Sequence, residues 1–328
     1  MRIAIIGFGS VGRGVAEAIA AKNIDLTITA VADSKSGAIE ASGLDIAAVI
    51  RNKNETGMCG SPTITVSDII SSDVYDVLIE VSPTNAETGE PALGYIRGAL
   101  EAGKHVVTSN KGPVALRFEE LHSLAAEHNV TLRYEATVCG AIPLMHTIEC
   151  GIAGNDISRL YGIFNGTCNY ILTRMAEEGL TYQQALLEAR ELGYAEADPT
   201  YDVKGIDAAI KLVILANAVW GMKKTLADVD IVGIDGVTSA AIALAEREDQ
   251  TIRLIGEIDP TNGILRVAPG ILPKSHPLVV RDTLNAVTIE TDLAGEITLI
   301  GKGAGSSETA SAIISDLLFI RDCHGRRN

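Results

Sequence analysis

Short apolar runs alternate with amphipathic segments along the first 135 residues. The runs have the length and the flanking turn residues of strands, and the segments between them repeat apolar positions with the period of a helix. We expect a parallel sheet covered by helices in a first domain, residues 1–135. Residues 34–72 are less regular and should hold a short helix, a loop and a strand. The predicted strands are 2–6, 26–32, 77–81, 105–108 and 131–135, and the predicted helices are 11–21, 88–102 and 116–128.

A different order of elements follows in a second domain, residues 136–302. Its later strands follow one another without long helices between them, which predicts a mixed or antiparallel sheet in an α+β domain. A third segment, 303–328, contains a predicted helix at 309–320 that we expect to return to the first domain. The elements predicted in the second domain are helices 143–150, 169–178, 182–192 and 205–220, and strands 159–164, 252–259, 264–269, 286–291 and 297–301.

Composition excludes several classes of partner. Hydrophobic residues make up 47% of the 328 residues, so large cores can form, but aromatic residues are only 4%. The formal net charge of −15 disfavours nucleic acid and anionic membrane surfaces, which would repel the chain. No apolar run is long enough to span a membrane, and the first residues form a strand pattern rather than a signal peptide. We therefore expect a cytoplasmic protein that acts on small molecules.

The cysteines do not form a recognisable framework. Five are scattered along the chain, at 59, 139, 150, 168 and 323. None has zinc-ligand spacing, and an odd number does not suggest paired disulfides. Most should be small buried hydrophobic residues. Cys323, near the end of the chain, is a hypothetical link between subunits.

A glycine-rich turn directly follows the first predicted strand. Gly7, Gly9 and Gly12 have GxGxxG spacing and lead into the first predicted helix, the context in which this motif predicts a Rossmann-type dinucleotide site. In such a turn the first glycine allows the sharp bend, the second lets a pyrophosphate approach, and the third lets helix and strand pack closely. The pattern indicates a nicotinamide cofactor and hydride transfer, with a flavin or another nucleotide in the same fold as the alternative.

The choice between NAD and NADP stays open. Asp33 ends the second predicted strand, where an acid can bind a ribose 2′-hydroxyl and favour NAD. Lys35, Arg51 and Lys53 could instead attract a 2′-phosphate. The structural alternative is that Asp33 caps a turn.

One lysine is a candidate for a ligand site, and a second belongs to a predicted ion pair. Lys111 follows the strand 105–108, and ligands of open α/β sheets bind beyond the carboxyl ends of the strands. Asp207 and Lys211 are four residues apart and share one face of a predicted helix. From composition alone this is an exposed ion pair. Asp202 can cap the same helix.

The region 189–211 resembles the signature of the homoserine dehydrogenase family. Further similarities occur in family order at 84–92, 110–111, 134–138, 165–172 and 303–312, so the resemblance spans nearly the whole chain. Cys139 departs from the family, since a small residue is usual there, and a C-terminal regulatory domain found in some members is absent from this sequence. The matching residues of the signature are Ala189, Gly193, Tyr194, Ala195, Asp198, Pro199, Asp202, Val203, Gly205, Asp207 and Lys211.

The resemblance implies a reaction and roles for the lysines. Members interconvert L-homoserine and L-aspartate 4-semialdehyde by hydride transfer with NAD or NADP, in the pathway to threonine and methionine. Lys211 would donate a proton to the aldehyde oxygen and Lys111 would polarise the same oxygen, although the sequence leaves open which lysine transfers the proton. Glu196, Asp207 and Asp202 would bind the substrate.

It also implies cofactor, cation and subunit contacts. Backbone carbonyls of Glu135, Val138, Gly140 and Ile142 would hold a structural sodium ion. The second domain would be catalytic and would form a homodimer, with a tetramer as the alternative. A dehydrogenase of another amino or hydroxy acid and a non-catalytic nucleotide-binding scaffold are the competing interpretations. The residues expected to contact the dinucleotide are Gly7, Phe8, Gly9, Ser10, Val11, Gly12, Asp33, Ser82, Pro83, Thr84, Lys111 and Gly303.

Overall fold

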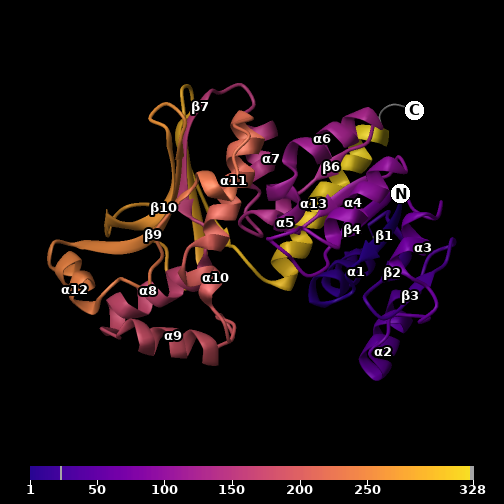
Figure 1. Cartoon of the computed structure of the whole chain (residues 1–328), viewed down its shortest axis with the longest axis horizontal. Coiled ribbons are helices and arrows are strands. Elements are labelled where there is room, and N and C mark those ends of the chain that lie inside the picture. Colours follow the sequence, from indigo (N-terminus) through magenta and orange to yellow (C-terminus); the bar gives the residue numbers. More distant parts are fainter. Residues whose placement is uncertain (23, 326–328) are drawn as a thin grey trace. The chain divides into compact units, whose positions relative to one another are not determined.

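The computed structural model describes residues 1–22 and 24–325 and divides them into two compact units (Figure 1). Unit 1 consists of Met1–Thr137 and the described residues from Gly305 onward, and unit 2 is Val138–Ala304. Residues 326–328 of the predicted C-terminal segment lie outside the described residues. Within the described part of the chain, no helix is long and apolar enough to cross a membrane.

Unit 1 is built on a six-stranded sheet in the order β3-β2-β1-β4-β5-β6. All neighbours are parallel except β3, which runs antiparallel to β2. The parallel sheet predicted from the alternating pattern is therefore confirmed. β6 is shorter than expected, and β3 appears in the irregular stretch 34–72. The strands are β1 (Arg2–Ile6), β2 (Thr27–Ala32), β3 (Gly37–Ile39), β4 (Val77–Glu80), β5 (His105–Thr108) and β6 (Leu132–Arg133).

The helices of unit 1 differ from the prediction mainly at their N-terminal ends. The expected helix 88–102 begins only at Ala92, because Gly89 has a left-handed φ of +76° and Pro91 has no N–H to donate. Residues 111–116, of which only the last was included in a predicted helix, form a short helix capped by the Asn110 side chain. The helices are α1 (Ser10–Lys22), α2 (Ile46–Thr56), α3 (Val66–Ile70), α4 (Ala92–Glu101), α5 (Lys111–Leu116) and α6 (Phe118–Glu127), with a 3₁₀ turn η1 (Glu135–Thr137).

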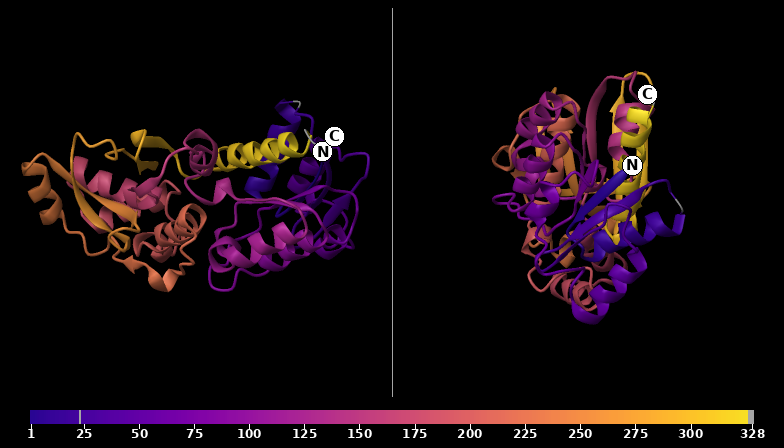
Figure 2. Two further views of the ribbon diagram at one scale, coloured as in Figure 1. Left: turned by 90° about the horizontal axis from the view of Figure 1, so that it is seen from above. Right: turned by 90° about the vertical axis from the view of Figure 1, so that its right-hand side faces the viewer.

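The C-terminal helix α13 (Ser306–Gly325) completes the core of unit 1. Figure 2 shows it in yellow alongside the indigo N-terminal elements, and it packs closely on α1. The two helices lie so close that a Cβ at Gly14 would be 2.4 Å from Ser306 Oγ. The Ser306 hydroxyl donates to the carbonyl of Ser10. Apolar side chains of α13, such as Ile313 and Leu317, are buried with those of β1 and α1.

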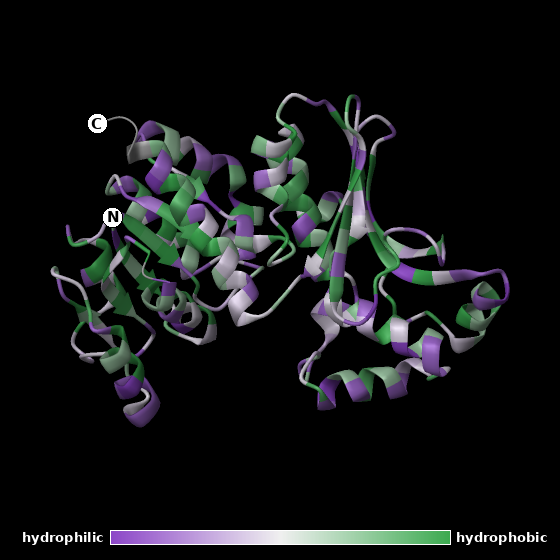
Figure 3. Cartoon of the chain, turned by 180° about the vertical axis from the view of Figure 1, so that it is seen from behind, coloured by the Kyte–Doolittle hydropathy of each residue, from purple (hydrophilic) through white to green (hydrophobic). Residues whose placement is uncertain are grey.

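Unit 2 contains a second six-stranded sheet, in the order β12-β11-β7-β9-β10-β8. Neighbouring strands are antiparallel except for the short parallel pair β10–β8, so the mixed sheet expected in an α+β domain is confirmed. In Figure 3 these strands carry both green, hydrophobic and purple, hydrophilic positions. The strands are β7 (Ile157–Ile163), β8 (Asp230–Ile231), β9 (Gln250–Asp259), β10 (Ile264–Pro273), β11 (Leu284–Thr291) and β12 (Gly295–Lys302).

The helices of unit 2 pack on one face of this sheet at close range. A Cβ at Gly256 in β9 would lie 2.7 Å from the Phe164 ring and 3.2 Å from Leu212. Glycine at that position therefore lets the helix α11 lie directly on the strand. The helices are α7 (Leu144–His146), the π-helical turn η2 (Thr147–Gly151), α8 (Gly166–Glu178), α9 (Tyr182–Glu191), α10 (Thr200–Val203), α11 (Ile206–Trp220), the 3₁₀ turn η3 (Leu226–Asp228) and α12 (Ser239–Arg247).

The cysteines follow the sequence prediction in most cases. Cys59, Cys139 and Cys168 are buried, whereas Cys150 and Cys323 are exposed, and all five are free thiols.

Candidate active site

The glycine turn of unit 1 has the shape that a dinucleotide phosphate requires. Gly7 has a φ of +99°, and a Cβ there would lie 2.4 Å from the backbone of Val81. A Cβ on Gly12 would lie 2.4 Å from the carbonyl oxygen of Gly7. At Gly9, by contrast, no atom other than those of Gly9 and its two chain neighbours lies within 4 Å of the position of a Cβ. Two glycines are thus needed for packing, and the third faces open space at the N-terminus of α1, where unpaired N–H groups attract anions.

The predicted cofactor residues of the turn differ in their exposure and in whether their N–H groups are available to a phosphate. Ser10 is exposed and Val11 is half-buried at the helix start, but the Phe8 side chain is fully buried in the core. The N–H groups of Gly7 and Phe8 both donate to the carbonyl of Ala32. These two residues shape the turn, and the groups that remain for a phosphate are those of the first turn of α1.

Asp33 sits at the carboxyl end of β2 in a cluster that the sequence only partly suggested. Its Oδ1 accepts the N–H groups of Lys35 and Ser36 at 2.7 and 3.0 Å, so it does cap a turn. Its Oδ2 forms an ion pair with Lys53 of α2. Burial alone would raise the pKa of Asp33, but the Lys53 ammonium and the two N–H donors lower it below its ordinary value. An acid and a base are therefore joined where a ribose 2′ position is expected.

A buried glutamate organises the loops after β4 and β5. Glu80 is inaccessible to solvent, and its carboxylate accepts hydrogen bonds from Ser82 and Thr108. Burial raises its pKa, although these donors lower it in part. Asn110 in turn donates to the carbonyl of Ser82. The predicted cofactor loop Ser82, Pro83 and Thr84 is thus tied to the strand ends by Glu80, which sequence reasoning missed.

Lys111 is the first residue of α5, immediately after this network. The Asn110 side chain caps the helix by accepting from Gly112 at 3.3 Å. A Cβ on Gly112 would lie 2.3 Å from the carbonyl oxygen of Asn85, so the helix start packs tightly against the loop after β4. Lys111 is half-buried at the carboxyl edge of the parallel sheet, which is the edge where ligands of such sheets bind.

The second cluster of polar groups lies in unit 2, around Lys211 of α11. Lys211 is 7% exposed and Asp207 is 5% exposed, so the exposed ion pair expected from composition is wrong. Lys211 Nζ lies 2.7 Å from Asp207 Oδ2 and donates to the carbonyl oxygen of Phe164 at 2.5 Å. α11 is apolar on most of its surface and is buried on all sides in its first turns, which takes the pair out of water.

Two further residues extend the cluster. Asn165 donates to both Asp202 Oδ1 at 2.7 Å and Asp207 Oδ2 at 3.0 Å. Its own Oδ1 accepts from the N–H of Cys168 and so caps α8. Asp202 lies inside α10 and does not cap α11, whose N-cap is the left-handed Gly205, so that expectation is corrected. Burial raises the pKa of Asp202, while Asn165 lowers it in part.

The Lys211 ammonium stays charged because the carboxylate of Asp207 compensates for its burial. Burial alone would lower the pKa of Lys211, but the carboxylate of Asp207 outweighs it and the pKa is raised above its ordinary value. An ammonium has three N–H donors. Two of them bind Phe164 and Asp207, and the third has no partner among the residues that the structure describes. A protonated lysine with one available donor is a group that can stabilise an oxyanion and deliver a proton.

The remaining predicted residues lie at different places in the fold. Glu196 is exposed in the loop before α10, and Gly303 follows β12 in unit 2. A Cβ on Gly303 would lie 2.3 Å from the side chain of Asn285, which also donates to the buried Cys139 thiol at 3.5 Å. Glu135 belongs to unit 1, whereas Val138, Gly140 and Ile142 belong to unit 2. Among the described residues, no group of three or more His, Cys, Asp or Glu side chains could hold a metal ion.

Comparison with known proteins identifies the family of the chain. Residues 143–318 match the model of the homoserine dehydrogenase family, and residues 7–135 match its NAD-binding domain. The chain belongs to the homoserine dehydrogenase family. It is an oxidoreductase with a nucleotide-binding domain for NAD or NADP.

Individual relatives are similar over almost the whole chain. The homoserine dehydrogenase of Methanocaldococcus jannaschii is 45% identical over 98% of both chains. An NAD(+)-dependent homoserine dehydrogenase of Pseudomonas canavaninivorans is 38% identical, covering 99% of this chain and 97% of the relative. The structure of a hyperthermophilic archaeal homoserine dehydrogenase in complex with NADPH superposes with a TM-score of 0.84 at 30% identity, covering 97% of this chain and 96% of that one.

Sequence reasoning missed three parts of the site. Phe164 contributes only a carbonyl, which leaves no signal in side-chain chemistry. Asn165 precedes Gly166 and Thr167 in the pattern of a helix N-cap, a signal that could have moved the predicted start of α8 from residue 169. Glu80 ends a buried apolar strand, and a single acid at that position could have been noted.

Proposed function

We propose that this protein interconverts L-homoserine and L-aspartate 4-semialdehyde with NAD or NADP, and that Lys211 is its proton donor. The single observation that supports the role of Lys211 is its buried ammonium, which is held charged by Asp207 and keeps one N–H donor available. The family assignment supports the substrate, since the relatives named above are homoserine dehydrogenases.

The chemistry follows from the charge that develops during reduction. A nicotinamide cofactor held at the glycine turn would supply the hydride that the terminal carbon of the substrate accepts. Negative charge then builds on the aldehyde oxygen. An ammonium in a low-dielectric site stabilises this charge more strongly than it would in water. Lys211 donates its proton to that oxygen, giving the alcohol, and is reprotonated from solvent. In the oxidative direction the same lysine, when neutral, accepts the alcohol proton.

The other residues have positioning or binding roles in this proposal. Asp207 holds Lys211 by an i,i+4 ion pair, and Asn165 holds Asp207 and Asp202 in turn. We assign Lys111 as the second cation that polarises the substrate oxygen, supported by its position at the carboxyl edge of the unit 1 sheet. The exposed carboxylate of Glu196, together with Asp202 and Asp207, would bind the α-ammonium of the substrate.

The cofactor site is proposed at the glycine turn. Open space beside Gly9 and the start of α1 fits a pyrophosphate, so the residues present suit the cofactor. Ser10, Val11 and the loop Ser82–Thr84 would surround it, and Phe8 would contribute only through the backbone of the turn. Asp33 and Lys53 would lie at the ribose, where the neutralised carboxylate would tolerate either a 2′-hydroxyl or a 2′-phosphate.

A cation and a subunit interface are also part of the proposal. Cys139 and Gly140 both have left-handed φ values, +59° and +52°, which form a compact turn between Val138 and Ile142. Backbone carbonyls of this turn would suit a sodium ion, because they are hard oxygen ligands. β12 is an edge strand with Ile300 53% exposed. Two copies pairing there would form a homodimer, as exposed edges are prone to pair.

The test is a steady-state assay with purified protein. We expect L-homoserine to reduce NAD, NADP or both, measured by the absorbance of the reduced nicotinamide, while L-serine and L-threonine serve as control alcohols. Turnover of a control alcohol but not homoserine would show that the enzyme belongs to a different substrate class. Cofactor binding without any turnover would instead favour a nucleotide-binding scaffold.

A further inference from the structure

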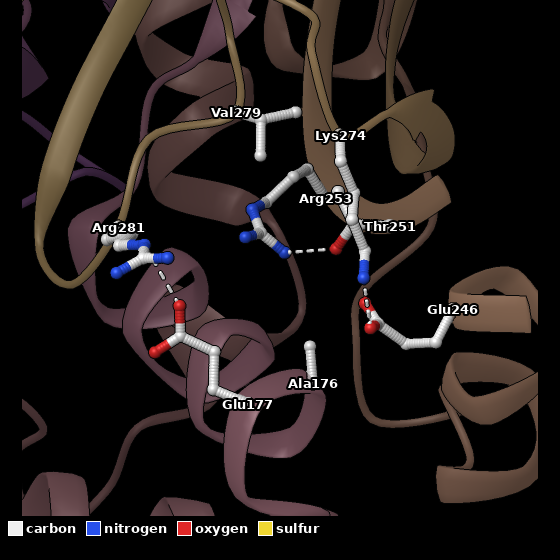
Figure 4. Close-up of a pocket in the computed structure, with 8 residues that line it drawn as sticks. All are labelled: Ala176, Glu177, Glu246, Thr251, Arg253, Lys274, Val279 and Arg281. Carbon is white, nitrogen blue, oxygen red and sulfur yellow. Dashed lines mark hydrogen bonds and ion pairs between the residues drawn. The ribbon is translucent and has the colours of Figure 1, made fainter. Parts of the chain in front are cut away.

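A cavity of about 530 Å³ opens in unit 2 among residues that the proposed reaction does not use. It lies between the C-terminal end of α8, helix α12, strand β9 and the segment that follows β10. Figure 4 shows its side chains, with Arg253 of β9 extending into the middle of the group. None of the Lys211 cluster lines this cavity.

Arg253 is the central feature because it is a buried cation with an incomplete set of partners. It is only 3% exposed. One end of its guanidinium donates to Thr251 Oγ1 at 2.8 Å and to the carbonyl of Ile252 at 2.9 Å. Its Nε is buried and has no hydrogen-bond partner, and no ion pair of Arg253 is found among the described residues. A buried cation without a counter-charge is costly, so a site of this kind favours an anion.

The surrounding charges limit which anion can fit. Arg281 pairs with Glu177 at 3.0 Å, and Lys274 pairs with Glu246, on opposite sides of Arg253 (Figure 4). The lining therefore holds three cations and two carboxylates, which leaves one positive charge. One negative charge balances it, whereas a dianion would be repelled by the two glutamates. Burial lowers the pKa of Arg253, and Glu177 and Glu246 offset this only in part.

The shape of the free groups points to a planar ligand. The Nη1 side of the guanidinium is occupied by the protein, and the Nε–Nη2 edge is the other side that can bind a carboxylate through two parallel hydrogen bonds. Val279 and Ala176 contribute apolar surface on either side of it (Figure 4). A small organic acid could place its carboxylate on Arg253 and its carbon atoms against these two residues.

We propose that this cavity is a second ligand site of the protein, and that it binds the carboxylate group of a small organic monoacid through Arg253. The site is independent of the proposed reaction, since it shares no residue with the glycine turn or with the Lys211 cluster.

Methyl NMR can test the site directly on the full-length protein. With Val279 and Ala176 labelled, we expect sodium acetate to shift both methyl signals saturably at constant ionic strength. Sodium chloride should not shift them, and inorganic phosphate should bind more weakly than acetate. Absence of a saturable acetate shift, or binding of phosphate as tight as that of acetate, would overturn the proposal.

Variants then locate the binding at the guanidinium. We expect Arg253→Met to weaken acetate binding at least about tenfold, and Arg253→Lys to weaken it less, because lysine keeps the charge and loses the paired donors. Arg266→Met is the matched control, because Arg266 is exposed on the neighbouring strand β10 and does not line the cavity. If Arg253→Met folded and bound acetate as the unmodified protein does, Arg253 would have a purely structural role. If Arg253→Met did not fold, the acetate titrations of the unmodified protein and of Arg253→Lys would still show whether acetate binds through Arg253.

Discussion

The Nζ atom of Lys211 lies 2.7 Å from Oδ2 of Asp207, one helical turn away, and both side chains are almost inaccessible to solvent. The spacing alone predicts such a pair, but an exposed ion pair contributes little to stability. A buried pair keeps a side chain charged in a place that water does not reach. In this protein the pair gives a lysine that stays protonated inside unit 2, with Phe164 and Asn165 completing the arrangement.

Replacing Lys211 by methionine should remove proton donation while leaving the cofactor domain intact. We expect kcat for reduction of aspartate 4-semialdehyde to fall by about 10²- to 10⁴-fold, the usual contribution of a general acid. NADH and NADPH binding, measured by fluorescence titration, should not change. Lys204→Met is the control, since Lys204 is an exposed lysine just before the same helix. Normal turnover by Lys211→Met would remove Lys211 from the mechanism.

Asp207→Asn should move the alkaline limit of activity to lower pH. In the unmodified protein the pKa of Lys211 is raised above 10.5, because Asp207 outweighs the effect of burial. The stabilisation from the pair is therefore complete below the ordinary lysine pKa and is lost only as pH rises through the raised value. Without Asp207, burial lowers the pKa of Lys211, and reduction should fail at a lower pH. The measurement is the pH profile of kcat, and an unshifted alkaline limb would contradict this role.

Gly9→Ala should separate cofactor binding from folding. Apart from Gly9 and its two chain neighbours, no residue has an atom within 4 Å of the position of its Cβ, so the variant should have the melting temperature of the unmodified protein. The methyl group would occupy the space proposed for the pyrophosphate, and the Kd for NADH and NADPH should rise at least about tenfold, or about 1.4 kcal/mol. Gly236→Ala is the matched control, as its Cβ also meets nothing within 4 Å. Unchanged affinity in Gly9→Ala would place the phosphates elsewhere.

Lys53→Met should shift cofactor preference towards NAD. Lys53 neutralises the carboxylate of Asp33. Without it, Asp33 would repel a 2′-phosphate and remain free to accept a hydrogen bond from a 2′-hydroxyl. We expect the ratio of kcat/KM for NAD over NADP to rise about tenfold. Arg51→Met tests the other basic residue of α2, which is exposed. Equal loss with both cofactors would mean that Lys53 acts only on the stability of the turn.

Asp316 should make folding stability depend on pH in the mildly acidic range. It is fully buried in α13, where burial raises its pKa from 3.8 to about 6 despite the ion pair with Arg133 at 3.0 Å. Between these values the folded state binds more protons than the unfolded state, so this group lowers the free energy of unfolding as pH rises from about 4 to 6. The full effect is up to about 3 kcal/mol.

Chemical denaturation of the unmodified protein and of Asp316→Asn at several pH values measures this contribution. The difference between the two stability curves should change between pH 4 and 6 and be constant above that range. Asp316→Asn should also be less stable overall, because the buried ion pair between Asp316 and Arg133 is lost. A constant difference across the acidic range would show that Asp316 keeps an ordinary pKa.

Much of the architecture could be predicted from local pattern. The strands β1 and β5 are specified by apolar runs, and the turn after β1 by glycines whose positions leave no room for a side chain at Gly7 and Gly12. Shorter elements such as β8, α10 and α12 were not predicted, because too few residues carry a periodic signal and their neighbours in space stabilise them.

The sequence by itself determined the fold class and the dinucleotide turn, because each depends on residue types at short spacing, and its resemblance to a family indicated the candidate lysines. Only the tertiary structure decided that Asp207 and Lys211 are buried, that Asn165 joins Asp207 to Asp202, and that Asp33 is neutralised by Lys53. These relationships join residues that are 20 to 42 positions apart, or depend on what covers a helix face. Burial and charge compensation are properties of the packed chain, and they set the pKa values on which the proposed chemistry depends.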